Sequence, residues 1–134
     1  MRNVEESIIV TNVDLQHLIP VLEQNDTPAS DALDAELRRA QVVEWAAVPP
    51  DVVTMNTEVV YEDVDTGVRR TVRVVYPREA DSAKGYVSVL APIGSALLGL
   101  RVGQSIEWSM PKGRRRVRVV EIRYQPESHG EHKR

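Results

Sequence analysis

The chain of 134 residues contains no cysteine and no phenylalanine. Without cysteine, the sequence excludes disulfide bonds, thiolate catalysis and Cys-ligated zinc. Its aromatic residues are two tryptophans and four tyrosines, so valine, leucine and isoleucine must build the core. A chain of this length suits one domain, or one domain with a small appendage.

The sequence also lacks a long apolar run and a targeting segment. No run approaches the roughly 18 apolar residues that a membrane-spanning helix needs. The first residues, MRNVEESIIV, have neither the basic start nor the apolar stretch of a signal peptide. We therefore expect a cytoplasmic protein with no membrane partner.

Basic residues are scarce in the first part of the chain. Residues 1–47 hold nine acidic residues and three arginines, whereas residues 48–134 hold eleven acidic residues and fourteen lysines or arginines. Opposite balances of this kind indicate two parts with different surroundings. We therefore divide the chain into residues 1–47 and residues 48–134.

The first part has the apolar period of helices. Thr11 is expected to cap a helix, with Asp14 as the acid of a capping box, and an apolar stripe follows at Leu15, Leu18, Ile19 and Leu22. Pro20 predicts a kink or an early end of this helix, because it removes a hydrogen bond.

A turn at residues 25–29 leads to a second helix, for which Ser30 is the expected cap. Its apolar stripe is Leu33, Leu37 and Ala40, and the prolines at 49 and 50 read as a linker. This helix would have about 17 residues, or about 25 Å from the rise of an α-helix. Residues 11–47 thus predict a short antiparallel helical hairpin.

After the prolines the apolar period changes to two, which is typical of strands. We predict one short helix at residues 93–98, a turn at 111–113, and strands at 58–63, 70–76, 86–90, 105–110 and 114–124. The apolar phase of the last strand slips after Val119, which predicts a β-bulge. The polar tail from Pro126 is expected to fray. The fold class is α+β.

The segment VSVLAPIGSALLGLRVG, residues 87–103, is nearly free of charge. A strand buried on both faces that leads into a buried helical turn would explain this composition. Loops on a rigid scaffold often carry binding residues, so a second role for the exposed part of the segment stays open.

No motif for catalysis, metal binding or phosphate binding stands out. The three histidines, His17, His129 and His132, have no partner nucleophile or convincing ligand set. The acids Asp26, Asp31, Asp34 and Glu36 gather near the tip of the hairpin, where helix capping explains Asp31 and Asp34 more simply than a metal does. We expect no catalytic residue, no cofactor, no metal and no small-molecule substrate.

The strongest charge cluster contains Arg114, Arg115, Arg116 and Arg118. On a strand, Arg115 would point away from the other three. Such a basic patch could contact nucleic-acid phosphates or an acidic protein, or it could be a solvated hairpin. Few aromatic side chains are present to stack on bases, so we expect at most a weak nucleic-acid contact.

Taken together, these features resemble the GreA/GreB transcription elongation factors. The likeness lies in the hairpin, the proline linker, the run Ser88-Val89-Leu90-Ala91-Pro92-Ile93-Gly94, the Leu97-Leu98-Gly99 that follows, and the late Pro111-Lys112-Gly113 turn. Within that family the chain is similar to the Rnk proteins at residues 31–37, 39–41, 51–56 and 124–127, and almost throughout residues 87–103. The resemblance implies a hairpin followed by an FKBP-like antiparallel β-sheet domain with one short helix.

The resemblance also implies a partner, core RNA polymerase, and a place on it. In Gre factors the C-terminal domain docks at the mouth of the secondary channel, partly through the loop that carries the Ser-Pro-Ile run. The matching positions here are Leu90, Ala91, Pro92, Ile93 and Gly94. Leu90 and Ala91 depart from the Gre pattern, which has Asn-Ser or Asp-Ser there.

Gre factors deliver acidic residues to the polymerase active centre on a long coiled coil. Here the arm is short and its tip offers one acid, Asp26. We therefore expect a regulator, not an enzyme, that competes with Gre factors without stimulating transcript cleavage. The alternatives are an elongation factor with residual Gre-like activity or an FKBP-like peptidyl-prolyl isomerase, whose aromatic pocket this chain can hardly supply. Control of nucleotide metabolism, which the Rnk name suggests, has no nucleotide site in the sequence.

Overall fold

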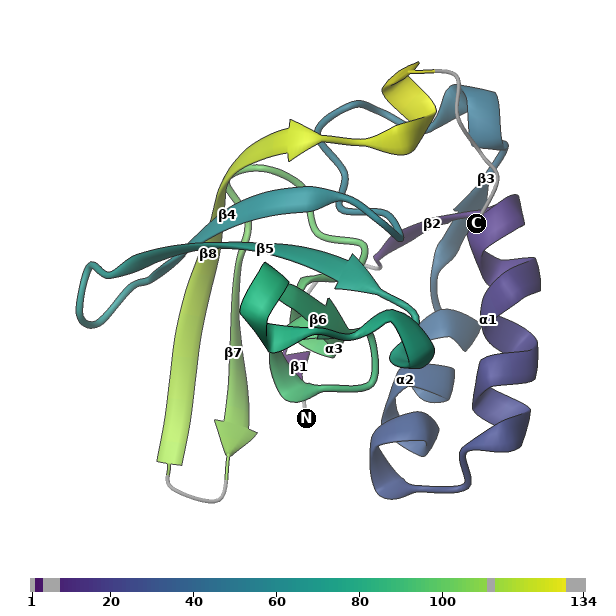
Figure 1. The fold of residues 1–134 in the computed structure, drawn as a ribbon, viewed down its shortest axis with the longest axis horizontal. Coiled ribbons are helices and arrows are strands. Elements are labelled where there is room, and N and C mark those ends of the chain that lie inside the picture. Colours follow the sequence, from purple (N-terminus) through teal and green to yellow (C-terminus); the bar gives the residue numbers. More distant parts are fainter. Residues whose placement is uncertain (1, 4–7, 111–112, 130–134) are drawn as a thin grey trace.

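Two N-terminal helices and a twisted sheet pack together in the computed structural model, which describes residues 2–3, 8–110 and 113–129 (Figure 1). The helices are α1 (Asn12–Gln24) and α2 (Pro28–Arg38), and they run antiparallel as a hairpin. The α+β class and the order of hairpin and sheet are therefore as the sequence predicted.

The cap of α1 is as predicted. The Thr11 hydroxyl oxygen accepts a hydrogen bond from the Asp14 backbone N–H at 3.0 Å, which satisfies one of the free donors of the first turn. Pro20 lies inside α1, which continues to Gln24, so the early end expected there is wrong.

The start and length of α2 differ from the prediction. Its cap is Thr27, whose hydroxyl accepts from the Ser30 N–H at 3.1 Å, and Pro28 is at the first helical position. The helix has 11 residues, or about 16 Å, rather than about 17 residues. It ends early because residues 41–43 leave the helix to form a strand.

That strand is β3 (Gln41–Val43), which pairs in parallel with β2 (Ile9–Thr11). The pair joins the two ends of the hairpin, since β2 leads into α1 and β3 follows α2. A 3-10 turn, η1 (Trp45–Ala47), then leads to the prolines. The sequence predicted neither β3 nor its pairing with β2.

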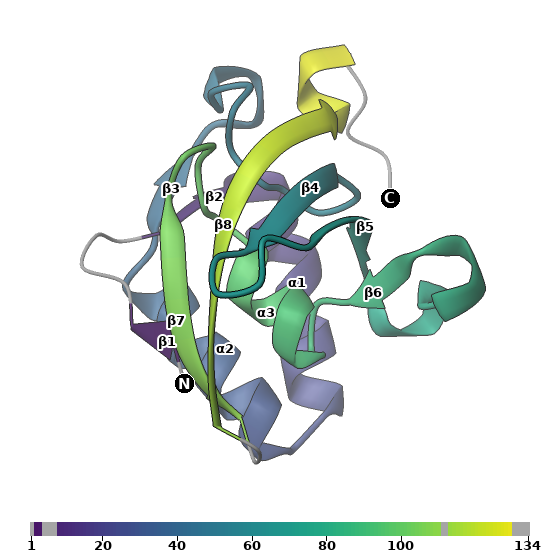
Figure 2. The same cartoon turned by 90° about the vertical axis from the view of Figure 1, so that its left-hand side faces the viewer.

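The large sheet has the order β1-β7-β8-β4-β5-β6 among the described residues. The strands are β1 (Arg2–Asn3), β4 (Glu58–Asp63), β5 (Arg69–Val75), β6 (Tyr86–Ser88), β7 (Ser105–Met110) and β8 (Gly113–Tyr124). All neighbours are antiparallel except β5 and β6, which are parallel. The crossover from β5 to β6 passes through the 3-10 turns η2 (Pro77–Glu79) and η3 (Ser82–Lys84), which project to one side in Figure 2.

The predicted bulge is present in β8. Its pairing with β4 shifts register twice, so that Val120 and Arg123 have no direct partner on β4. The extra residues change which side chains face the core, because side chains alternate along a strand. Val117 and Val119, before the bulge, are buried, and Ile122, beyond it, packs against the same core.

One core joins the hairpin to the sheet. Leu18 and Leu33 of the helices lie in the same buried cluster as Val59, Val74 and Leu97. Gly99 packs closely against Ile8, the residue before β2. A Cβ at Gly99 would lie 2.5 Å from the Cβ of Ile8, and the φ of Gly99 is +85°. Only glycine is accommodated at that point.

The segment after β8 is ordered as far as the structure describes it. Gln125 is buried and its Nε2 donates to the carbonyls of Pro49 and Val52, each at 2.8 Å. Glu127, in the 3-10 turn η4 (Pro126–His129), accepts from the Thr54 hydroxyl at 2.8 Å. The prediction of fraying is therefore wrong for residues 126–129, while residues 130–134 and the predicted turn at 111–112 lie outside the described residues.

Candidate functional site

The segment from Leu90 to Gly94 connects β6 to the short helix α3 (Pro92–Leu97). Ser88, at the end of β6, holds the start of this segment. The Ser88 hydroxyl oxygen accepts a hydrogen bond from the Leu90 N–H at 3.0 Å, and the Ser88 carbonyl accepts one from the Ala91 N–H at 2.9 Å. Proline suits the first helical position because the N–H it lacks would have no partner there. The loop is thus held in one shape by hydrogen bonds to the Ser88 side chain and backbone.

Exposure within this loop is graded. Pro92 is exposed, Leu90, Ala91 and Ile93 are half-buried, and Gly94 is buried. Leu90 and Ile93 pack against the core, which holds the exposed parts of their side chains in place. The loop therefore presents a small apolar surface in which Pro92 is the most exposed residue.

Gly94 explains how the loop can lie so close to β6. A Cβ at this position would lie 2.1 Å from the Ser88 carbonyl oxygen and 3.2 Å from the Val89 Cα. No side chain fits between the helix and the strand end. Gly94 is a packing requirement of the loop and is not itself available for contact.

The rest of the uncharged segment builds the core. Val89, Ala96, Leu97, Leu98 and Leu100 are all buried. The expectation of a strand buried on both faces is wrong, however, because β6 is a half-buried edge strand of only three residues. The strand ends before the apolar run does because Leu90 has already turned toward α3.

The tip of the hairpin carries one exposed acid between the helices. Asp26 is exposed, and the turn beside it is held by the Asn25 side chain, which donates to the Val21 carbonyl at 2.7 Å. On α2, Arg38 donates to Asp34 at 2.9 Å and Arg39 donates to Glu36 at 2.7 Å. Within residues 2–3, 8–110 and 113–129, no three acids or histidines gather closely enough to hold a metal ion.

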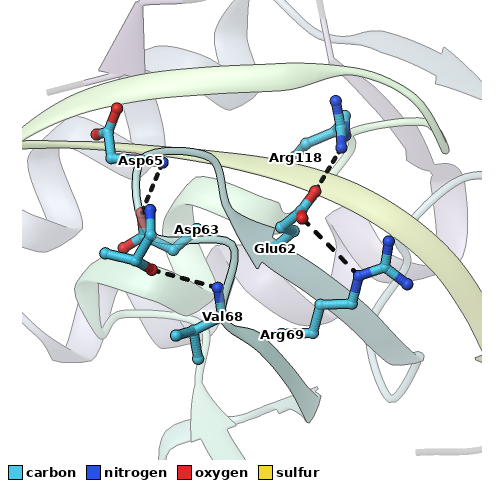
Figure 3. A network of polar contacts seen from close by, with 7 residues as sticks. Glu62, Asp63, Asp65, Val68, Arg69 and Arg118 are labelled. Atoms are coloured by element: carbon cyan, nitrogen blue, oxygen red, sulfur yellow. Dashed lines mark hydrogen bonds and ion pairs between the residues drawn. The ribbon is translucent and has the colours of Figure 1, made fainter.

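The arginines of β8 lie among carboxylates of the neighbouring strands. Figure 3 shows Glu62 of β4 between Arg118 and Arg69, with an Arg69 Nε–Glu62 Oε2 distance of 3.9 Å. Arg114 and Arg116 lie 3.5 and 3.6 Å from Glu107 of β7. This basic patch therefore carries less net charge than its arginine count suggests.

Arg115 points away from the other three, as the alternation predicted, and lies 2.7 Å from Asp63. The Asp63 carboxylate also accepts from the backbone N–H groups of Asp65 at 3.0 Å and Thr66 at 3.3 Å. Burial favours the neutral acid, but these hydrogen bonds and the Arg115 charge outweigh it and lower the pKa of Asp63. Asp63 thus holds the β4–β5 turn (Figure 3).

The pKa of Tyr61, on the same strand, is shifted in the opposite direction. Burial raises the pKa of its phenol, and the nearby positive charges of Arg70 and Arg115 offset only part of that effect. The phenol is therefore neutral under ordinary conditions. Neither this group nor Asp63 was singled out by the sequence, because the partners that shift them come from other strands.

His17 lies between the hairpin and the sheet domain. Its ring meets the ring of Tyr76 edge to face, with centroids 6.4 Å apart, beside a cleft of about 350 Å³. The tail histidines do not join it: His132 lies outside the described residues, and the side chain of His129 is not described. The structure thus brings together no catalytic pair among the histidines that it describes.

The described residues include no helix with both the length and the apolar character to cross a membrane. The sites described so far are surface features: the loop at residues 90–94, the hairpin tip and the β8 arginines. They suit contact with another macromolecule.

Comparison with known proteins gives matches over nearly the whole chain. The family model described as "Transcription elongation factor, GreA/GreB, C-term" matches residues 48–124, and the "Rnk N-terminus" model matches residues 6–43. The chain is 42% identical over 130 residues to the "Regulator of nucleoside diphosphate kinase" of Escherichia coli, covering 94% of this chain and 96% of that protein.

Two further matches concern elongation factors. The GreA of Azorhizobium caulinodans is 34% identical over 92 residues, which are 69% of this chain but only 59% of that protein. A solved structure described as "Prokaryotic transcription elongation factor GreA/GreB from Nitrosomonas europaea" is 41% identical, with a TM-score of 0.75 over 90% of this chain and all of that one. These relatives are regulators and elongation factors by name.

Proposed function

Because the chain belongs to the GreA/GreB family of transcription factors, we propose that it binds core RNA polymerase at the mouth of the secondary channel. Binding there would exclude Gre factors, and it would not stimulate transcript cleavage. The observation that carries this proposal is the apolar loop of Leu90, Ala91, Pro92 and Ile93, which the resemblance matches to the loop through which Gre factors dock.

The loop has the properties of a preformed protein-binding surface. Three hydrogen bonds donated by the backbone N–H groups of Leu90, Ala91 and Ser95 define its course, so little conformational entropy is lost when a partner binds. Pro92 contributes exposed apolar surface, and proline has a fixed φ of its own. Leu90 and Ala91 replace the polar pair of Gre factors, so we propose that this contact is mainly apolar.

The arm supports binding without cleavage. At about 16 Å, α2 is shorter than the sequence alone suggested. Asp26 is the acid at its tip, and a single carboxylate on a short arm could not share a metal ion in the way that a pair on a long arm could. We therefore propose that the hairpin stays near the channel mouth.

The division of labour follows the division of the chain. We propose residues 1–47 as a truncated coiled coil and residues 48–134 as the docking domain. The paired state of Arg114, Arg116 and Arg118 favours a structural role, so we assign at most a weak nucleic-acid contact to this patch.

The proposal is tested with stalled elongation complexes. Adding this protein alone should produce no shortened transcripts, whereas adding it before GreB should slow GreB-dependent cleavage in proportion to its occupancy. Asp26→Asn should behave like the wild type in both reactions. Cleavage by the wild-type protein that Asp26→Asn abolishes would instead support the alternative, an elongation factor with residual Gre-like activity.

A further inference from the structure

A groove runs along the hairpin between α1 and α2. Leu15, Ile19 and Leu22 of α1 line one side, Leu37 of α2 contributes to the other, and the hollow measures about 510 Å³. The function proposed above uses the loop at residues 90–94 and does not account for this groove.

The apolar stripe of α1 is wider than the core can cover. Leu18 is completely buried, whereas Ile19 leaves 46% of its surface exposed. Leu15 and Leu22, four residues before and three residues after Ile19, are half-buried and lie on the same side of the helix. An exposed isoleucine flanked in this way extends an apolar surface and is not an isolated residue.

The charges around the groove are arranged unevenly. Near the hairpin tip, Glu23 and Asp31 are exposed, and in the part of the chain that the structure describes neither forms an ion pair. Toward the other end, Asp34 is neutralised by Arg38 at 2.9 Å. The groove is therefore negative at its tip end and close to neutral at its far end.

We propose that this groove binds an amphipathic helix of a partner protein, with its lysines or arginines at the end nearest the hairpin tip. The ridge from Leu15 to Leu22 spans about 10 Å, or two helical turns, which matches apolar anchors at i, i+4 and i+7. The negative tip end excludes nucleic-acid backbones and selects a basic segment. This inference does not depend on polymerase binding.

The test uses the full ¹⁵N-labelled chain and a synthetic amphipathic peptide of about 18 residues, long enough to form a helix on binding. The peptide carries leucines at i, i+4 and i+7 and lysines at one end; its control has glutamates in place of the lysines. Saturable shifts centred on Ile19, Leu22, Glu23 and Asp31 are expected for the lysine peptide. The glutamate peptide should bind about tenfold more weakly or worse.

Two exposed aliphatic positions allow a matched comparison of variants. Ile19→Asp should lower the affinity for the lysine peptide at least about tenfold. Val42→Asp, which changes a β3 side chain that is 48% exposed, should leave that affinity unchanged. Ile19→Ala, which adds no charge, should lower it less than Ile19→Asp does. Equal affinity for the two peptides, shifts centred elsewhere, or no saturable binding would each overturn the proposal.

Discussion

The carboxylate of Asp14 accepts a hydrogen bond from the backbone N–H of Met55 at 3.0 Å. Asp14 is in the first turn of α1, and Met55 is in the loop before β4, so this bond links the hairpin to the sheet domain. Asp14 is 2% exposed and Met55 is completely buried. The angle of the hairpin to the sheet domain therefore depends in part on this carboxylate.

Asp14→Ala should lower the free energy of unfolding by about 1–3 kcal/mol, because it leaves the buried Met55 N–H without its acceptor. Asp14→Asn should lower it less, since its amide oxygen can still accept. Urea denaturation gives both values. Asp26→Ala is the matched control at an exposed acid, and its change should stay within about 0.5 kcal/mol. Equal losses for Asp14→Ala and Asp26→Ala would show that the Met55 bond is not stabilising.

Gly94→Ala tests the packing of the loop at residues 90–94 against β6. The new Cβ would overlap the Ser88 carbonyl, which is backbone and cannot rotate away, so we expect a loss of about 1–3 kcal/mol in unfolding free energy. Ser95→Ala, at the next residue of α3, should change it by less than about 0.5 kcal/mol. A Gly94→Ala protein as stable as the wild type would mean that the loop is looser than the structure indicates.

Pro92→Asp tests the proposed apolar contact of this loop with polymerase and should leave the fold intact. Acidic side chains are favoured in the first turn of a helix, so the variant should keep the thermal stability of the wild type. A charge in an apolar contact should weaken polymerase binding at least about tenfold, which corresponds to about 1.4 kcal/mol. Val102→Asp changes another exposed aliphatic residue, 40% exposed, and should bind normally. Identical polymerase affinities for Pro92→Asp and Val102→Asp would show that Pro92 does not contact the polymerase.

The lowered pKa of Asp63 predicts a specific response to acid. A carboxyl group whose pKa is lower in the folded state stabilises the protein fully above its unfolded value of about 3.9. That contribution is lost as the pH falls through the lower folded-state pKa. The stability advantage of the wild type over Asp63→Asn should therefore shrink as the pH falls below about 4.

Denaturation midpoints in urea between about pH 2.5 and 6 would measure this effect. Arg115→Gln removes one of the groups that lower the pKa of Asp63, so its acid-induced loss of stability should be smaller than in the wild type and should be complete at a higher pH. A difference between wild type and Asp63→Asn that is the same at every pH would contradict the assignment.

Local signals in the sequence were sufficient for much of the fold. The Thr11 cap, the order of hairpin and sheet, and the bulge near Val120 each depend on neighbouring residues or on a simple period. The alternation that separates Arg115 from Arg114 and Arg116 is of the same kind. These features were predicted because the residues that determine them are close in the sequence.

Features that depend on distant residues could not be predicted in this way. The strand β3 forms because β2, about thirty residues earlier, offers an edge to pair with, and this pairing shortens α2. The Asp14–Met55 bond and the partners of Asp63 have no signal in the sequence for the same reason. The cap of α2 is a different kind of miss, because Ser30 was predicted and the local signal of Pro28 at the first helical position, which places the cap at Thr27, was overlooked.

The central claim is that this chain occupies the mouth of the polymerase secondary channel. A titration of core RNA polymerase with the labelled full-length protein, repeated with saturating GreB, tests it most directly. The account predicts saturable binding that GreB abolishes and that Pro92→Asp weakens. Binding that persists unchanged in saturating GreB, or no binding at micromolar concentration, would contradict it.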